Sequence, residues 1–128
     1  MAITTVYSLN TLQAEFRANS VTDSNQGSSN VIGLSNGGYA VVYGAEALFD
    51  RVPWLEIYSS PTDTTPTTVG VFDNSGTGYT DMIGEPVVTE LADGTIAVVW
   101  KESAAGDNKL VATFVNATTG QVVAREVQ

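Results

Sequence analysis

The pattern of hydrophobic and polar positions is dominated by short apolar runs. Each of these runs comes shortly after a turn that contains glycine. Tyr39–Tyr43 and Ile96–Trp100 are apolar at every position, and an Asn-Gly or Asp-Gly pair stands just before each. These pairs favour a tight hairpin, because both central positions of a type I′ turn need positive φ. The pattern predicts hairpin turns at residues 35–38 and 92–95. Strands that are apolar at every position are usually covered on both faces, so we expect a cover on each face of these two strands.

The two hairpins belong to an internal duplication. Gly27–Tyr43 aligns without a gap on Gly84–Trp100, and seven of the seventeen aligned positions are identical. The identical pairs are Gly27/Gly84, Val31/Val88, Leu34/Leu91, Gly37/Gly94, Ala40/Ala97, Val41/Val98 and Val42/Val99. An ordered match of this kind indicates a repeated structural unit. We call this match the repeat alignment. Tyr43 and Trp100 share a position in it, and we predict that both pack in the core or between the repeats.

Further along the chain the two copies match at a smaller separation. The aligned pairs there are Val69/Val111, Phe72/Phe114, Asn74/Asn116 and Gly78/Gly120. The change in separation predicts an insertion in the first copy, within residues 44–68. Insertions in repeat proteins map to loops on one face, which is often the binding face. The first repeat is then expected at about 27–83, with a strand at Leu55–Tyr58, and the second at about 84–128.

The chain is predicted to form one all-β domain over residues 1–128. Its length suits a single core. Residues 11–17 are compatible with two helical turns, but Glu15–Asn19 alternates as a strand does, and we favour the strand. The expected architecture is two four-stranded antiparallel, blade-like repeats plus this N-terminal strand. Four strands are the size of a propeller blade. Two blades cannot close a ring, so the fold is either propeller-like and completed by oligomerisation or neighbouring tandem blades, or a sandwich.

Composition narrows the function. Five basic against fourteen acidic residues give a net charge of −9 and a pI near 4.1, so nucleic acids and anionic membranes are disfavoured partners. Cysteine and histidine are absent, which removes disulfides, Cys-based zinc sites and the usual general base at neutral pH. We therefore predict a protein that is not an enzyme. Neither a Sec-type signal peptide nor a membrane-inserted segment is expected.

Two stretches resemble the tandem repeats of large bacterial type I secreted, RTX-associated adhesins and surface proteins. The first joins Glu15–Asn19, a polar spacer and Ser29–Tyr43; the second joins Pro86–Trp100 and Phe114–Gly120. The resemblance implies propeller-like blades, a location outside the cell or on a cell or virion surface, and frequent use of calcium. The chain departs from the family pattern because it has two copies, lacks the G-G-x-G-x-D calcium repeats and carries the predicted insertion.

Residues 73–81 suggest a calcium loop. Asp73, Ser75, Thr77 and Asp81 place oxygen ligands at the 1, 3, 5, 9 spacing of a loop that wraps a hard cation. Position 12 is Gly84, where a bidentate Glu would belong. The second copy has Val115, Ala117, Thr119 and Val123 at the matching positions, so the site is not a property of the repeat. The alternative is a plain turn between strands.

The predicted insertion gathers a second candidate site: Phe49, Asp50, Arg51, Trp54 and Tyr58. Aromatic rings beside a carboxylate and a guanidinium suit a glycan. The same residue types concentrate at protein interfaces, and simple packing remains a third interpretation.

Carboxylates are the last candidates, because glycoside cleavage needs a pair of them at a set separation. They are Glu46, Asp50, Glu85, Glu90 and Glu102, and solvated surface positions are the favoured alternative. The leading hypothesis is a non-enzymatic extracellular module that binds a glycan or adheres to a surface. A self-assembling structural subunit of a virion or an extracellular filament is the alternative, and a glycosidase-like enzyme is the third.

Overall fold

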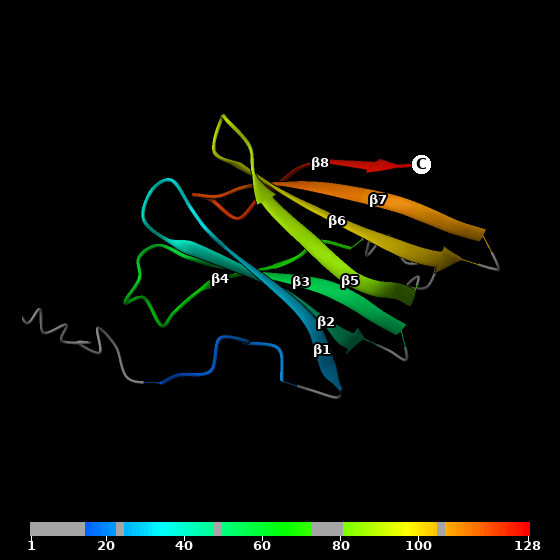
Figure 1. The fold of residues 1–128 in the computed structure, drawn as a ribbon, viewed down its shortest axis with the longest axis horizontal. Coiled ribbons are helices and arrows are strands. Elements are labelled where there is room, and N and C mark those ends of the chain that lie inside the picture. The colour runs from blue at the N-terminus through cyan, green and yellow to red at the C-terminus, as the bar shows by residue number, and fades with distance from the viewer. Residues whose placement is uncertain (1–14, 23–24, 48–49, 73–80, 105–106) are drawn as a thin grey trace, which may run out of the picture.

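The protein is a sandwich-like stack of two four-stranded antiparallel sheets (Figure 1). The computed structural model describes residues 15–22, 25–47, 50–72, 81–104 and 107–128. Sheet A has the order β1 (Gln26–Gly33), β2 (Tyr39–Ala47), β3 (Asp50–Tyr58), β4 (Thr67–Gly70). Sheet B has the order β5 (Asp81–Glu90), β6 (Thr95–Ala104), β7 (Asp107–Asn116), β8 (Val122–Val127). The prediction of an all-β fold with four strands per repeat is confirmed, and the described part of the chain has no helix.

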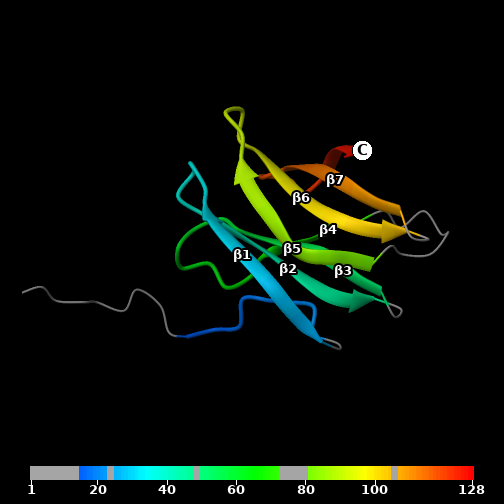
Figure 2. The same ribbon diagram turned by 45° about the vertical axis from the view of Figure 1, so that its right-hand side comes forward.

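The inner faces of the two sheets enclose one hydrophobic core. Figures 1 and 2 show the sheets as two layers, with the first strands β1 and β5 close together at one side. Sheet A contributes Leu34, Ala40, Val42, Leu55, Ile57, Val69 and Val71, and sheet B contributes Met82, Val88, Ile96, Val98, Trp100, Val111 and Val115. The sheets stay open and do not close into a ring, so the sandwich alternative describes the fold.

The repeat alignment extends without a gap through all four strands. Val41 pairs with Glu56 in sheet A, and its equivalent Val98 pairs with Thr113 in sheet B. The next pairing, Glu56 with Thr68, corresponds in the same way to Thr113 with Arg125. The duplicated unit therefore keeps its register from Asn30 to the last strand. At the start of the first strand the pairing differs by one residue, because Gln26 pairs with Ala45 whereas its equivalent Ile83 pairs with Lys101.

The predicted insertion within residues 44–68 is wrong. This segment contains β3, which corresponds to β7 in the repeat alignment and is an ordinary strand of the repeat. Val69 lies in β4, whereas Val111 lies in β7, so the match between these two residues had joined strands that are not equivalent.

The two sheets turn opposite faces of the repeated unit toward the core. Val42 faces the core in sheet A, whereas its equivalent Val99 lies on the outer face of sheet B. Conversely, Trp100 faces the core, and its equivalent Tyr43 lies on the outer face of sheet A. The back of one unit thus packs on the front of the next, an arrangement that we call face-to-back stacking.

Both predicted hairpins are present, but their turn type differs from the prediction. Gly37 donates to the carbonyl of Leu34 at 3.0 Å, while Leu34 donates to Gly38 at 2.9 Å, and the second hairpin repeats this pattern. Gly37 and Gly94 have positive φ, whereas the preceding Asn36 and Asp93 do not. These contacts define a turn followed by one left-handed glycine, as in a G1 bulge, and not the expected type I′ turn.

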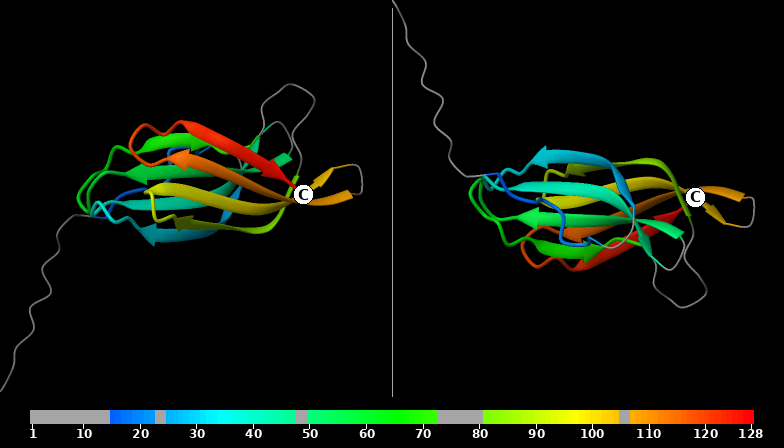
Figure 3. Two further views of the ribbon diagram at one scale, coloured as in Figure 1. Left: turned by 90° about the horizontal axis from the view of Figure 1, so that it is seen from above. Right: turned by 90° about the horizontal axis from the view of Figure 1, so that it is seen from below.

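The predicted N-terminal strand is not formed. The described residues 15–22 make no strand ladder and instead cross the outer face of sheet A, as the right-hand view in Figure 3, seen from below, shows. The hydroxyl of Tyr58 donates to the carbonyl of Ala18 at 2.6 Å, and the amide of Val21 donates to the hydroxyl of Tyr43 at 3.2 Å. The segment covers β2 and β3 on the side away from the core, so the cover expected on both faces of Tyr39–Tyr43 is confirmed.

Candidate functional site

The structure separates the five residues of the predicted aromatic site. Phe49 lies outside the described residues. Asp50, Trp54 and Tyr58 point to the outer face of sheet A, because side chains alternate along a strand. Arg51 points to the opposite face, where its Nη2 atom donates to Ser28 Oγ at 2.9 Å. The guanidinium therefore does not join the aromatic residues.

Tyr58 is part of the interior. Its side chain is fully buried, and its ring stacks on Tyr39 with centroids 4.4 Å apart and planes 5° apart. Phe16 packs edge-on against the same ring at 5.8 Å. Burial raises the pKa of Tyr58 to about 12, with the nearby Glu56 carboxylate adding to the shift. Tyr58 therefore has no surface to offer to a ligand.

Trp54 is half-buried at the far side of the same face. Its ring meets Phe72 edge-on at 5.2 Å between centroids. Its indole nitrogen is buried and has no hydrogen-bond partner among the described residues. Trp54 is therefore mainly a packing residue.

A buried carboxylate organises the centre of this face. Glu56 is fully buried, and its Oε1 atom accepts from Tyr43 Oη and from the Ser20 amide, each at 2.8 Å. Its Oε2 atom accepts from Thr68 Oγ1 at 2.7 Å. Burial and the carboxylate raise the pKa of Tyr43. Sequence reasoning missed Glu56, although an acidic residue inside the apolar run Leu55–Tyr58 was a usable signal.

A groove lies between the N-terminal segment and the strands β1 and β2. It has a volume of about 630 Å³, and its apolar lining includes Phe16, Val31 and Tyr39. Glu15 and Asn30 supply a carboxylate and an amide at the same groove. A smaller hollow of about 270 Å³ adjoins this groove and shares Ala18, Ser29 and Val41 as lining residues. Val31 is 62% exposed and open to a ligand. We call this feature the N-terminal groove.

A second hollow, of about 400 Å³, lies where the loop between β3 and β4 meets the turn between β7 and β8. Asp63 lines it, but hydrogen bonds from the chain occupy both carboxylate oxygens. The Oδ2 atom accepts from Ser59, and the Oδ1 atom accepts from Thr65. These bonds lower the pKa of Asp63 well below its usual range. Asp63 therefore shapes the loop.

Only one of the four proposed calcium ligands lies among the described residues. Asp73, Ser75 and Thr77 lie outside the described residues. Asp81 begins β5, and its Oδ1 atom accepts from the Arg51 amide at 3.1 Å. The described parts of the chain hold no cluster of three or more acidic, histidine or cysteine side chains that would suit a metal.

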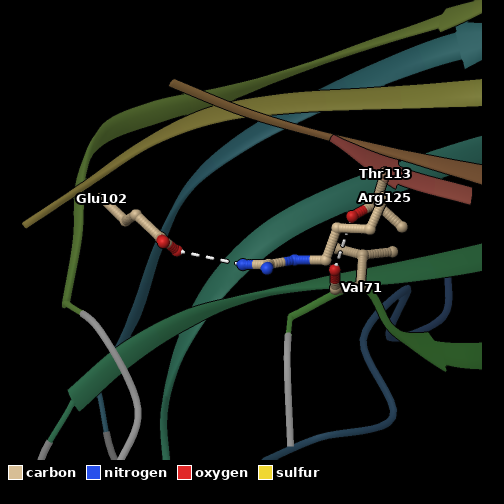
Figure 4. Close-up of polar contacts among 4 residues, drawn as sticks. All are labelled: Val71, Glu102, Thr113 and Arg125. Carbon is tan, nitrogen blue, oxygen red and sulfur yellow. Dashed lines mark hydrogen bonds and ion pairs between the residues drawn. The ribbon is translucent and has the colours of Figure 1, made fainter. Parts of the chain in front are cut away.

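The candidate catalytic carboxylates are dispersed. Glu90 accepts two hydrogen bonds from Ser35, 2.7 Å from its amide and 2.6 Å from its hydroxyl, and so joins the first turn of sheet A to sheet B. Glu102 pairs with Arg125 at 3.4 Å (Figure 4). Because Glu90 ends β5 and Glu102 pairs with Met82 near its beginning, the two lie at opposite ends of the β5–β6 hairpin. Glu46, Asp50 and Glu85 are separate from both: Glu46 and Asp50 lie on sheet A, and Glu85 is exposed on β5.

No protein-family model, curated protein or solved structure matches the chain at a significant level. Within the described segments, no helix is long and apolar enough to span a membrane.

Proposed function

We propose that the protein is a non-enzymatic extracellular binding module that holds a glycan in the N-terminal groove. The observation that carries the proposal is the composition of this groove. Phe16 and Tyr39 offer apolar ring surfaces, and Glu15 and Asn30 add polar groups beside them. Concave, mainly apolar sites with a few polar groups are typical of small-ligand binding. The resemblance of the repeats to those of secreted adhesins supports the same location and role.

The charge of the protein selects among glycans. The chain carries a net charge of −9, and Glu15 adds a carboxylate at the groove itself. Like charges repel at such a site, so acidic sugars are disfavoured. Neutral oligosaccharides are the proposed ligand class.

A glycan array that holds neutral and sialylated oligosaccharides tests the proposal, and titration calorimetry then measures the affinity for the best ligand. Val31→Asp places a new charge in the groove at a side chain that is 62% exposed. We expect this change to weaken binding by about tenfold or more, which corresponds to about 1.4 kcal/mol.

Val87→Asp is the matched control, because Val87 is 56% exposed on the first strand of sheet B. The control variant is expected to bind as the unmodified chain does. Absence of binding to every glycan, or an equal loss in the two variants, would contradict the proposal.

A self-assembling structural role is the second candidate. The observation that favours it is the apolar outer face of sheet B, where Val87 and Leu110 are more than half exposed. Large exposed apolar patches commonly mark interaction sites. A glycosidase-like role has the least support, since Glu90 and Glu102 stand at opposite ends of a hairpin.

A further inference from the structure

The centre of the outer face of sheet B is apolar, although Lys101 lies opposite Leu110 and Glu126 lies opposite Ala112 on the same face. An antiparallel sheet with one solvated face is expected to alternate apolar and polar residues. In β6, however, Ala97 and Val99 on the outer face are as apolar as Val98 and Trp100 on the core face. The left-hand view in Figure 3, seen from above, looks onto this outer face, and the described residues place no segment over it.

Sheet A shows what covers the equivalent face. On the outer face of sheet B, Val99, Leu110, Ala112 and Phe114 lie next to one another across β6 and β7. In the repeat alignment they correspond to Val42, Pro53, Leu55 and Ile57, all of which are buried in sheet A. The cover over these residues is the inner face of sheet B, formed by branched aliphatic side chains around Trp100. The chain thus contains its own example of the complementary surface.

The other end of the stack is already closed. Residues 15–22 occupy the outer face of sheet A, where they contact Tyr43, Glu56 and Tyr58. A second copy of the chain would have to remove this cover before its sheet A could stack on sheet B. Terminal units of repeat proteins commonly carry such a capping layer. The open position is therefore on sheet B.

The path of the chain fits an addition at that position. Gly70 ends β4, and the chain then crosses from sheet A to β5 of sheet B. Val127 is the equivalent of Gly70, because it pairs with Val111 as Gly70 pairs with Trp54. A segment that follows β8 therefore starts from the same position relative to sheet B as the segment after β4 does relative to sheet A.

We propose that the outer face of sheet B is a docking surface for one further four-stranded sheet of the same repeat, seated as sheet B is seated on sheet A. This inference is independent of the glycan proposal. It predicts that Val99, Leu110 and Phe114 become as buried as Val42, Pro53 and Ile57 when the further sheet is present.

A fusion protein tests the proposal. Residues 71–128 are appended directly after Val127, so that the new junction reproduces the step from Gly70 to Val71. Stability in stacked repeats comes largely from the interfaces between neighbours. We expect one cooperative unfolding transition at a higher temperature than that of the unmodified chain, and stronger protection of β6 and β7 amides in hydrogen exchange.

Leu110→Lys in the central unit of the fusion tests the surface itself. Leu110 is 55% exposed, so the substitution should change the melting temperature of the unfused chain little. In the fusion, it should separate unfolding into two transitions and remove the added protection. Val31→Lys is the control, because Val31 is 62% exposed at the capped end of the stack. This control should leave the single transition intact.

Three results would overturn the proposal. The first is an appended unit that remains unfolded or unfolds independently of the rest of the chain. The second is a single unfolding transition that persists in the fusion with Leu110→Lys. Alternatively, the unfused chain would form a dimer that Leu110→Lys abolishes, which would show that a second copy covers this face.

Discussion

Glu56 and Thr113 hold the same position in the repeat, yet the carboxylate lies outside the sandwich and the hydroxyl lies inside it. Both side chains are fully buried. Glu56 accepts a hydrogen bond from the Ser20 amide, whereas Thr113 donates to the carbonyl of Val71 at 2.8 Å (Figure 4). In each sheet, this position bonds to the layer that covers it: the N-terminal segment on sheet A, and the chain at the end of β4 on sheet B.

Replacing Glu56 with glutamine should destabilise the protein. Glu56 accepts from three donors, and the new amide group would face one or more of them with its own N–H groups. We expect a loss of about 1–3 kcal/mol in the free energy of unfolding, measured by chemical denaturation. Glu85→Gln is the control on an exposed side chain and should have little effect. Equal stability of the two variants would contradict this account of Glu56.

Thr113→Val removes a hydroxyl with almost no change in shape. Its hydrogen bond to Val71 is buried between the sheets, so the Val71 carbonyl would lose a partner. We predict a cost of about 1 kcal/mol. The variant should also raise hydrogen exchange at the end of β4 more than in β6. An unchanged unfolding midpoint would show that this hydrogen bond makes no net contribution to the free energy of unfolding.

Gly94→Ala should cost about 1 kcal/mol through the backbone alone. Gly94 has a φ of 83°, and nothing lies within 4 Å of an added Cβ, so the cost cannot come from a collision. Gly33→Ala is the control, since Gly33 has equal space but no positive φ. The control should be neutral or slightly stabilising, because alanine restricts the unfolded chain. Equal melting temperatures would show that the turn tolerates a side chain.

The protein should lose stability at alkaline pH. Tyr58 ionises in the unfolded chain near its ordinary pKa of 10, whereas its pKa in the folded protein is about 12. A raised pKa gives a stabilisation that is present below pH 10 and is lost as the pH rises toward 12. The pKa of Tyr43 shifts in the same direction. Denaturant midpoints measured from pH 9 to 12 should fall, and the fall should be smaller in Tyr58→Phe. A constant midpoint across this range would contradict the burial of these phenols.

The first two strands of each repeat could be predicted from the sequence, while the last two could not be aligned. Val41 and Val98 keep their identity because turn and strand packing constrain both sheets. Leu55 and Ala112 differ because the same face of the unit is buried in sheet A and partly exposed in sheet B. Between β3 and β7 only Asp50 and Asp107 are identical in the repeat alignment, so the sequence held too few matches there to show one continuous alignment.

The N-terminal groove depends on the packing of the N-terminal segment against sheet A, a contact that the local sequence does not reveal. Glu15–Asn19 alternates like a strand, but the Ala18 carbonyl and the adjacent Ser20 amide bond to side chains of sheet A and not to a neighbouring backbone. The cover that buries Tyr58 comes from Ala18, 40 residues earlier in the chain. Tyr58 could therefore not be recognised as interior, and the N-terminal groove could not be foreseen.

The order of the strands sets the order in which the molecule can be completed during synthesis. Each sheet is a simple meander of neighbouring strands, so the four strands of sheet A leave the ribosome before any strand of sheet B. During that interval the apolar side of sheet A, with Val42 and Leu55, has no partner layer. Nascent chains with exposed apolar surface are prone to aggregate. Residues 1–70 carry six acidic and only two basic side chains, and the repulsion between like net charges opposes association of these growing chains before sheet B is made.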